Sequence, residues 1–90
     1  MANGFLSRVS RKFKAGTVLF RDGEVGETMF VLQKGEVRVF KEVNNTEQTL
    51  AILGAGEFFG EMAILNEKPR TASAIVESDA TVLGYRPQDF

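Results

Sequence analysis

The sequence contains neither cysteine nor histidine. Without cysteine there is no disulfide, iron–sulfur ligand or thiol nucleophile, and without histidine there is no imidazole base or histidine-bound metal. The usual serine-triad and zinc chemistries are therefore excluded. No apolar run approaches about 20 residues, so no helix of the chain could span a bilayer, and the first residues lack the apolar core of a secretory signal. We expect a cytoplasmic location, or the cytoplasmic side of a membrane protein.

Length and charge place narrow bounds on the fold and its partners. The chain has 90 residues, 43% of them hydrophobic and eight of them phenylalanine, which predicts one small domain with a single packed core. The net charge of −1 gives no global field toward nucleic acid or membrane. The charge is nevertheless uneven, because the first acid, Asp22, follows five basic residues: Arg8, Arg11, Lys12, Lys14 and Arg21. This basic segment indicates either a solvated face or a contact with an acidic neighbouring domain.

Short β-branched and aromatic runs alternate with glycine-containing turns, which is typical of an all-β barrel or sandwich. The expected strands cover residues 17–20, 28–33, 36–43, 47–53, 72–78 and 81–86. Asn44-Asn45 is a plausible tight turn, since asparagine tolerates positive φ. Phe40 breaks the alternation of Val37 and Val39, so we expect a bulge or a second buried face there. Most glycines are interpreted as turn residues.

Helix is scarce in this pattern. Phe5–Val9 could form a short helix, and Glu61–Leu65 is expected to form a single turn. Arg86 and Pro87 resemble the opening of a further helix, with proline in its first turn. The sequence therefore predicts strands with only short helical pieces.

The segment Phe59–Ser73 is the strongest candidate for a ligand site. It places a carboxylate, Glu61, nine residues before a guanidinium, Arg70. A carboxylate suits a sugar hydroxyl, and an arginine fork suits a phosphate. Each residue also has a simpler interpretation, because Glu61 could merely favour the helix dipole and Arg70 could form a surface ion pair. The two residues could also pair with each other.

Backbone donors and small residues complete this candidate site. The N–H groups of Gly60, Glu61, Met62 and Ala63 would be the free donors of a helix start, which readily binds anions. The side chain of Met62 is expected to pack apolar surface, so only its N–H counts toward the site. Gly60 could also permit a close approach of the backbone to a ligand. Thr71 and Ser73, two residues apart, are expected on one side of a strand.

The chain resembles the cyclic-nucleotide-binding domains of kinase regulatory subunits, gated channels and catabolite activators. The resemblance covers roughly Phe13 to Phe90 and rests on two motifs, F-K-A-G-T-V-L-F-R-D-G-E-V-G-E-T-M-F-V-L-Q-K-G-E-V-R-V and F-G-E-M-A-I-L-N-E-K-P-R-T-A-S-A. The second motif is similar to the family's phosphate-binding cassette. The resemblance implies a mainly β, eight-stranded jelly-roll-like β-roll, with a short helical turn in the cassette and minimal terminal helices.

The resemblance also implies roles for individual residues. Glu61 would accept the ribose hydroxyl and Arg70 would bind the cyclic phosphate of cAMP or cGMP. The implied ligand-binding set is Gly60, Glu61, Met62, Ala63, Arg70, Thr71 and Ala72. A threonine at Thr71 goes with tolerance of cGMP, so both ligands stay open. No cofactor or metal is expected beside the nucleotide.

The family places two helices after the barrel, and the sequence stops where the first would begin. We therefore expect residues 1–90 to be a single β-roll without its C-terminal lid helices, relaying occupancy to an effector domain beyond Phe90. The segment itself is expected to make no nucleic-acid contact, because it has no helix-turn-helix. It is expected not to be an enzyme. The alternatives are a nucleotide-independent interaction barrel and, less compatible with the absence of histidine, a metal-dependent barrel enzyme.

Overall fold

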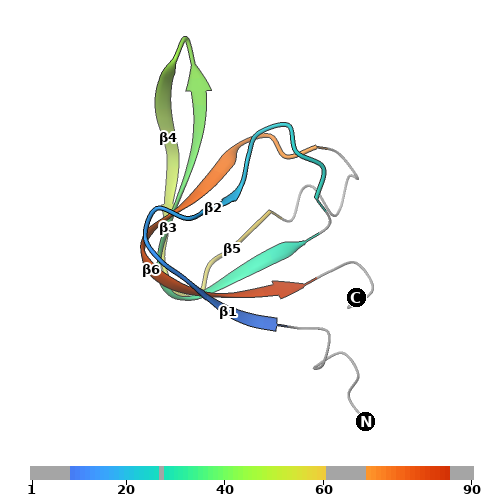
Figure 1. Ribbon diagram of the computed structural model, residues 1–90, viewed down its shortest axis with the longest axis vertical. Coiled ribbons are helices and arrows are strands. Elements are labelled where there is room, and N and C mark those ends of the chain that lie inside the picture. The colour runs from blue at the N-terminus through green and yellow to red at the C-terminus, as the bar shows by residue number, and fades with distance from the viewer. Residues whose placement is uncertain (1–8, 27, 61–68, 86–90) are drawn as a thin grey trace.

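The protein forms one antiparallel sheet that bends into a roll (Figure 1). The computed structural model describes residues 9–26, 28–60 and 69–85, and no residue in these ranges is helical. The six strands are β1 (Val9–Phe13), β2 (Val18–Phe20), β3 (Met29–Val43), β4 (Thr46–Leu53), β5 (Phe58–Phe59) and β6 (Ser73–Tyr85). Their order is β1-β6-β3-β4, with β2 paired to β6 and β5 paired to β3. The prediction of a mainly β roll is confirmed.

Two long strands, β3 and β6, run through the whole sheet and turn at the same corner (Figure 1). At this corner Gly35 has a φ of 91°, and a Cβ there would lie 2.7 Å from the Cα of Ala80 and would also overlap the carbonyl oxygen of Asp79. Glycine therefore lets two backbones approach where a side chain would separate them. The predicted breaks at Lys34-Gly35 and near residue 80 are wrong, because each strand continues through its bend. The described part consequently contains six long or short strands rather than eight.

The predicted turn and bulge of the β3–β4 hairpin are both confirmed. Asn44 and Asn45 adopt φ values of 55° and 65°, as a tight hairpin turn requires. Val39 pairs with Ala51 but Phe40 pairs with Thr49, so one extra residue of β4 bulges out. The bulge keeps Phe40 buried, at 6% exposure.

The first strand was not predicted. Val9, which was expected to end a short helix, instead begins β1 and pairs with Gly84 of β6. The rest of that expected helix lies outside the described residues, as do the expected turn Glu61–Leu65 and the helix opening at Arg86. β1 reads Val-Ser-Arg-Lys-Phe, with three consecutive polar residues, so local periodicity alone gave no apolar face to detect, and pairing with β6 decides its conformation.

The core lies between the two arms of the bent sheet. Its fully buried members are Leu32, Val37, Val76 and Val82, and each contributes on the order of 1.5–3 kcal/mol through burial. Three phenylalanines from different strands extend this core toward β5. The rings of Phe20, Phe30 and Phe59 lie with centroids 5.2–6.1 Å apart. This aromatic group forms one wall of the candidate site.

Candidate ligand-binding site

Arg70 is fixed by backbone hydrogen bonds to the loop that follows β2. Its N–H donates to the carbonyl oxygen of Glu24 at 2.7 Å, and its own carbonyl accepts from the N–H of Gly23 at 2.7 Å. The loop is closed by a turn in which Glu24 Oε1 accepts from the N–H of Arg21 at 2.8 Å. Gly23 has a φ of 91°, which this turn requires. The arginine is thus held by two segments that are far apart in the sequence.

The guanidinium of Arg70 is buried among backbone carbonyls and aromatic rings. The residue is 6% exposed. Nη1 donates to the carbonyl oxygen of Gly60 at 3.0 Å, and Nη2 donates to that of Thr28 at 2.8 Å. The Cζ atom lies 4.4 Å from the ring centroid of Phe20 and 5.7 Å from that of Phe30. These contacts orient the cation through dipoles and ring quadrupoles rather than through an opposite charge.

One donor of this buried group is left over. The Nε atom of Arg70 is buried and has no hydrogen-bond partner among the described residues. A buried donor without a partner costs free energy, so its presence needs an explanation. No ion pair to Arg70 occurs within the described part of the chain. The arginine therefore combines a fixed orientation with an unneutralised charge, and this arrangement can bind an anion.

Two glycines make room for the guanidinium. A Cβ at Gly60 would lie 2.7 Å from Nη1, and a Cβ at Gly26 would lie 2.6 Å from Nη2. Gly60 also has a φ of 82°, whereas Gly26 has no positive φ. Gly60 makes room for the Arg70 side chain, and the expected close approach of its backbone to a ligand remains a prediction. Gly26 is therefore not a glycine required by a positive φ, and its lack of a side chain leaves space for Nη2.

Burial and charge act on Arg70 in opposite directions. Burial lowers the pKa of the Arg70 guanidinium, because a desolvated cation is less stable than a hydrated one, and the charge of Glu24 partly opposes this. The group remains a cation at neutral pH, since arginine titrates far above that range. A nearby anion would therefore offset the electrostatic cost of burying this cation.

The structure describes four of the seven predicted site residues, and the other three lie outside the described ranges. Gly60 and Arg70 are brought together, and Ala72 lies buried beside them in sequence at 9% exposure. Thr71 is exposed. Glu61, Met62 and Ala63 lie outside the described residues. The binding roles of the whole set remain predictions.

Thr71 and Ser73 do not share a face, so that expectation is wrong. Ser73 is buried, and its Oγ accepts a hydrogen bond from the N–H of Asp22 at 2.9 Å. Residues 71 and 72 form a bend before β6 begins at Ser73, and the twofold alternation of a strand does not extend across a bend.

Four contributors to the site were not singled out from the sequence. Phe20 and Phe30 supply the rings, Thr28 supplies a carbonyl oxygen, and Gly26 supplies space. The signal that could have identified Gly26 is its position three residues after the turn glycine Gly23, beyond what the turn itself needs. The rings and the carbonyl depend on tertiary packing, which no local pattern reveals.

The fold and this arginine define a small β-domain with a buried, oriented guanidinium, and comparison with known proteins gives its family. The family model "Cyclic nucleotide-binding domain" matches residues 10–90. The chain belongs to the cyclic nucleotide-binding domain family. The family is one of regulatory ligand-binding domains.

Relatives of known name have the same domain in larger proteins. The cyclic AMP receptor protein of Thermus thermophilus is 37% identical over 81 residues, which cover 89% of this chain and 38% of that protein. A cAMP-dependent protein kinase regulatory subunit of Hypocrea atroviridis is 41% identical over 73 residues, covering 81% of this chain and 15% of the subunit. The chain therefore spans well under half the length of these relatives.

Solved structures support the same grouping. The regulatory domain of Toxoplasma gondii PKA, crystallised with cAMP, superposes with a TM-score of 0.91 at 30% identity, over 98% of this chain and 34% of that one. The EAL enzyme Bd1971 in its cGMP-bound form gives a TM-score of 0.87 at 30% identity, over 90% of this chain and 22% of that one. These neighbours hold cAMP or cGMP as their ligand. In the described part of this chain, no helix is long and apolar enough to cross a membrane.

Proposed function

We propose that this domain binds cAMP or cGMP, with Arg70 holding the cyclic phosphate, and that it relays occupancy to another domain of a larger protein. The observation that carries the proposal is the buried Arg70 guanidinium, oriented by the carbonyls of Gly60 and Thr28 and lacking an ionic partner among the described residues. A cyclic phosphate carries one negative charge and two exocyclic oxygens, which match a cation with a spare donor.

The cassette residues would complete recognition of the nucleotide. We infer that Glu61 accepts the ribose 2′-hydroxyl and that N–H groups of Gly60, Met62 and Ala63 assist at the phosphate. Thr71 and Ala72 would line the same ligand, and Thr71 would allow cGMP to bind as well as cAMP. These assignments are supported by the cassette motif and by family membership.

Relay of the signal would be a shift of population between two states. A ligand that binds one arrangement of the cassette more tightly shifts the domain toward that arrangement by its difference in affinity. Relatives that combine the domain with kinase-regulatory or EAL segments support an effector partner. The single-domain boundary, the lid helices beyond Phe90 and the cytoplasmic location remain predictions.

The proposal is tested by isothermal titration of cAMP, cGMP and 2′-deoxy-cAMP into the wild-type chain and the variant Glu61→Gln. Wild type should bind both cyclic nucleotides and should lose affinity for the 2′-deoxy ligand. Glu61→Gln should bind cAMP more weakly and should discriminate less against 2′-deoxy-cAMP. An equal loss for the deoxy ligand in both proteins would remove Glu61 from the ribose contact. No binding of either cyclic nucleotide by folded wild type would favour the nucleotide-independent barrel.

A further inference from the structure

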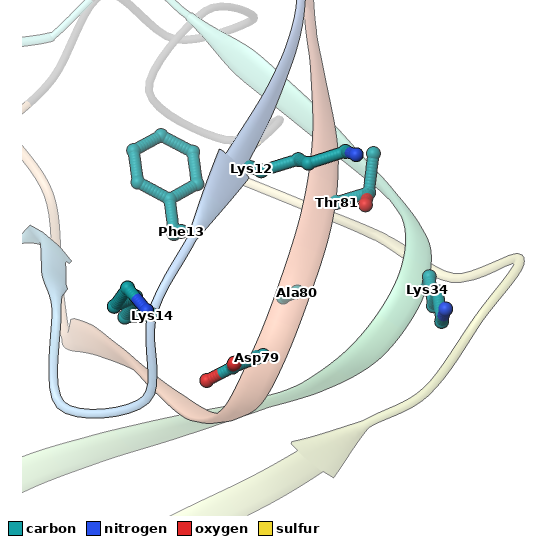
Figure 2. A pocket seen from close by; sticks show the side chains of 7 residues that line it. All are labelled: Lys12, Phe13, Lys14, Lys34, Asp79, Ala80 and Thr81. Carbon is teal, nitrogen blue, oxygen red and sulfur yellow. The ribbon is translucent and has the colours of Figure 1, made fainter.

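A second charged site shares no residue with the Arg70 site. It is a hollow of about 360 Å³, shown in Figure 2. Its lining residues are Lys12, Phe13, Lys14, Lys34, Asp79, Ala80 and Thr81. Two of its lysines belong to the basic segment of the sequence, for which the proposed nucleotide site gives no role.

Strand register places two of the lysines in one row. Lys12 of β1 and Lys34 of β3 both pair with Thr81 of β6, so the three residues are cross-strand neighbours on one face of the sheet. Two strand spacings separate the lysines, which is about 10 Å between their backbones. Lys14 follows the end of β1 and lines the same hollow. The hollow is therefore a spread array of cations rather than a single point of charge.

The backbone around these lysines is firmly held. Pairing of β3 with β6 shifts register on both sides of Lys34, beside the close contact at Gly35. The carbonyl oxygen of Lys14 accepts from the Thr17 hydroxyl at 2.7 Å, and the N–H of Ala15 donates to Asp79 Oδ1 at 2.9 Å. Bulges commonly redirect a side chain at a functional position.

The charge of the hollow is not neutralised within the described part of the chain. Lys12, Lys14 and Lys34 are exposed and make no ion pair with any described residue. Asp79 is the one acid in the lining, and one of its oxygens already accepts from Ala15. Figure 2 places Lys14 and Lys34 on either side of Asp79 and β6. The hollow consequently presents net positive charge, with Phe13 and Ala80 as its apolar lining residues.

We propose that this lysine hollow docks an extended acidic peptide segment, with carboxylates at alternate positions, from a partner protein or domain. Alternate side chains of an extended peptide lie about 6.6 Å apart, which suits two lysines that are two residues apart in the chain, Lys12 near the end of β1 and Lys14 just after it. A further carboxylate reaches Lys34 across β6. A lone phosphate fits this array less well, because its charge is compact whereas the lysine backbones span about 10 Å. The Phe13 ring accommodates the aliphatic stems of the acidic side chains.

Fluorescence anisotropy with the labelled peptide Glu-Ser-Glu-Ser-Glu tests the proposal on the whole chain. We expect saturable binding to wild type. The triple variant Lys12→Ser, Lys14→Ser, Lys34→Ser should lose affinity about tenfold, as expected for three exposed ion pairs removed together. The matched control is Arg11→Ser, Arg21→Ser, Lys41→Ser, which removes the same charge from exposed positions outside the lining and should change affinity less than about twofold. An equal loss in both triples, or no binding by wild type, would overturn the proposal.

A variant with the opposite expected sign separates this result from misfolding. Asp79→Asn keeps an oxygen for the Ala15 N–H but removes the only lining carboxylate, so it should bind the peptide about twofold more tightly. Binding that is unchanged or weaker would contradict the proposal.

Competition with pyrophosphate tests whether the hollow prefers small anions. If pyrophosphate displaces the peptide at a far lower concentration than a matched acidic dipeptide does, the hollow would be assigned to small anions instead. Titration with cAMP of the same triple variant should be unaffected, so the two proposals fail independently.

Discussion

Two arginines of this domain lie over phenylalanine rings, but only one of them has its charge neutralised by carboxylates. The Cζ of Arg38 is 4.7 Å from the Phe40 ring and that of Arg70 is 4.4 Å from the Phe20 ring. Arg38 donates from Nη2 to Glu47 at 3.0 Å and from Nε to Glu77 at 3.4 Å. Arg70 donates to two carbonyls and keeps its Nε–H unpartnered among the described residues.

The difference separates an arginine whose charge is balanced by carboxylates from the one that we propose binds the phosphate. The hydrogen bond that Arg38 donates to Glu47 is the main reason that the pKa of Arg38 is raised, whereas burial lowers the pKa of Arg70. Carboxylates on Arg38 cancel its charge locally and leave nothing for a ligand. Carbonyl dipoles and rings orient Arg70 without cancelling its charge, which is the preorganisation that anion binding needs. Removing each arginine, or what supports it, tests this contrast.

Truncation of the two arginines should give the largest contrast. Arg70→Ala should weaken cAMP binding by about 1.5–3 kcal/mol, or roughly 10- to 150-fold in Kd, because a charge-assisted phosphate contact is lost. Arg38→Ala should leave Kd within about twofold, since its charge is already paired. Isothermal titration measures both values. Comparable losses of cAMP affinity in the two variants would mean that Arg70 and Arg38 do not differ in their contribution to binding.

Filling the space beside Arg70 should have the next largest effect. Gly26→Ala places a Cβ 2.6 Å from Nη2, so the guanidinium must move. We expect about 1–2 kcal/mol weaker cAMP binding, because the flexible Arg70 side chain avoids the clash by moving its guanidinium away from the position of the phosphate. Gly54→Ala is the matched control, since nothing lies within 4 Å of its Cβ and its φ is not positive. Equal cAMP affinity in the two variants would show that Arg70 needs no such fit.

Removal of the supporting rings should have a smaller effect on affinity. Phe20→Leu should weaken cAMP binding by about 0.5–1 kcal/mol, as one cation–π support of Arg70 is lost. Phe40→Leu removes the ring under Arg38 and serves as its counterpart. Both variants should lower the melting temperature, because both rings are at least partly buried. Only Phe20→Leu should change Kd, and a matching change in Phe40→Leu would assign the effect to general destabilisation.

The carboxylates of Arg38 should have the smallest effect. Glu47→Gln should lower the free energy of unfolding by less than about 1 kcal/mol, because Arg38 and Glu47 are solvent-accessible and screened. The difference from wild type should shrink in high salt, as chemical denaturation at two salt concentrations would measure. A cAMP affinity altered by this substitution would contradict the purely structural role of Arg38.

Local chemistry explains which parts of this account the sequence could predict. Asn44-Asn45 and the run around Phe40 carry turn and alternation signals within a few residues, and both predictions are confirmed. Gly35 was recognised as special but was interpreted as a turn, because a bend that maintains pairing and a turn that ends it use the same residue. β1 pairs with β6, some 70 residues away in the sequence, and no pattern within β1 itself predicts that pairing.

The candidate site shows the same limit. Arg70 was identified because its residue type and its spacing from Glu61 suit a phosphate and a sugar. The residues that support Arg70 were not identified from the sequence. Phe20, Gly26 and Thr28 come near Arg70 only after the loop that follows β2 folds back. Backbone hydrogen bonds of Gly23 and Glu24 with Arg70 hold the loop in that position. Sequence motifs therefore identified the group that would contact ligand, and tertiary structure was needed to show what prepares it.

The most direct test of the central claim is a ligand cycle, in which cAMP and adenosine are titrated into wild type and Arg70→Ala. The account predicts that wild type prefers cAMP, which carries the phosphate, and that most of this preference disappears in Arg70→Ala, while adenosine binds both proteins alike. If the preference for cAMP were equally large in Arg70→Ala, the phosphate would be bound elsewhere. The buried guanidinium would then have only a structural role.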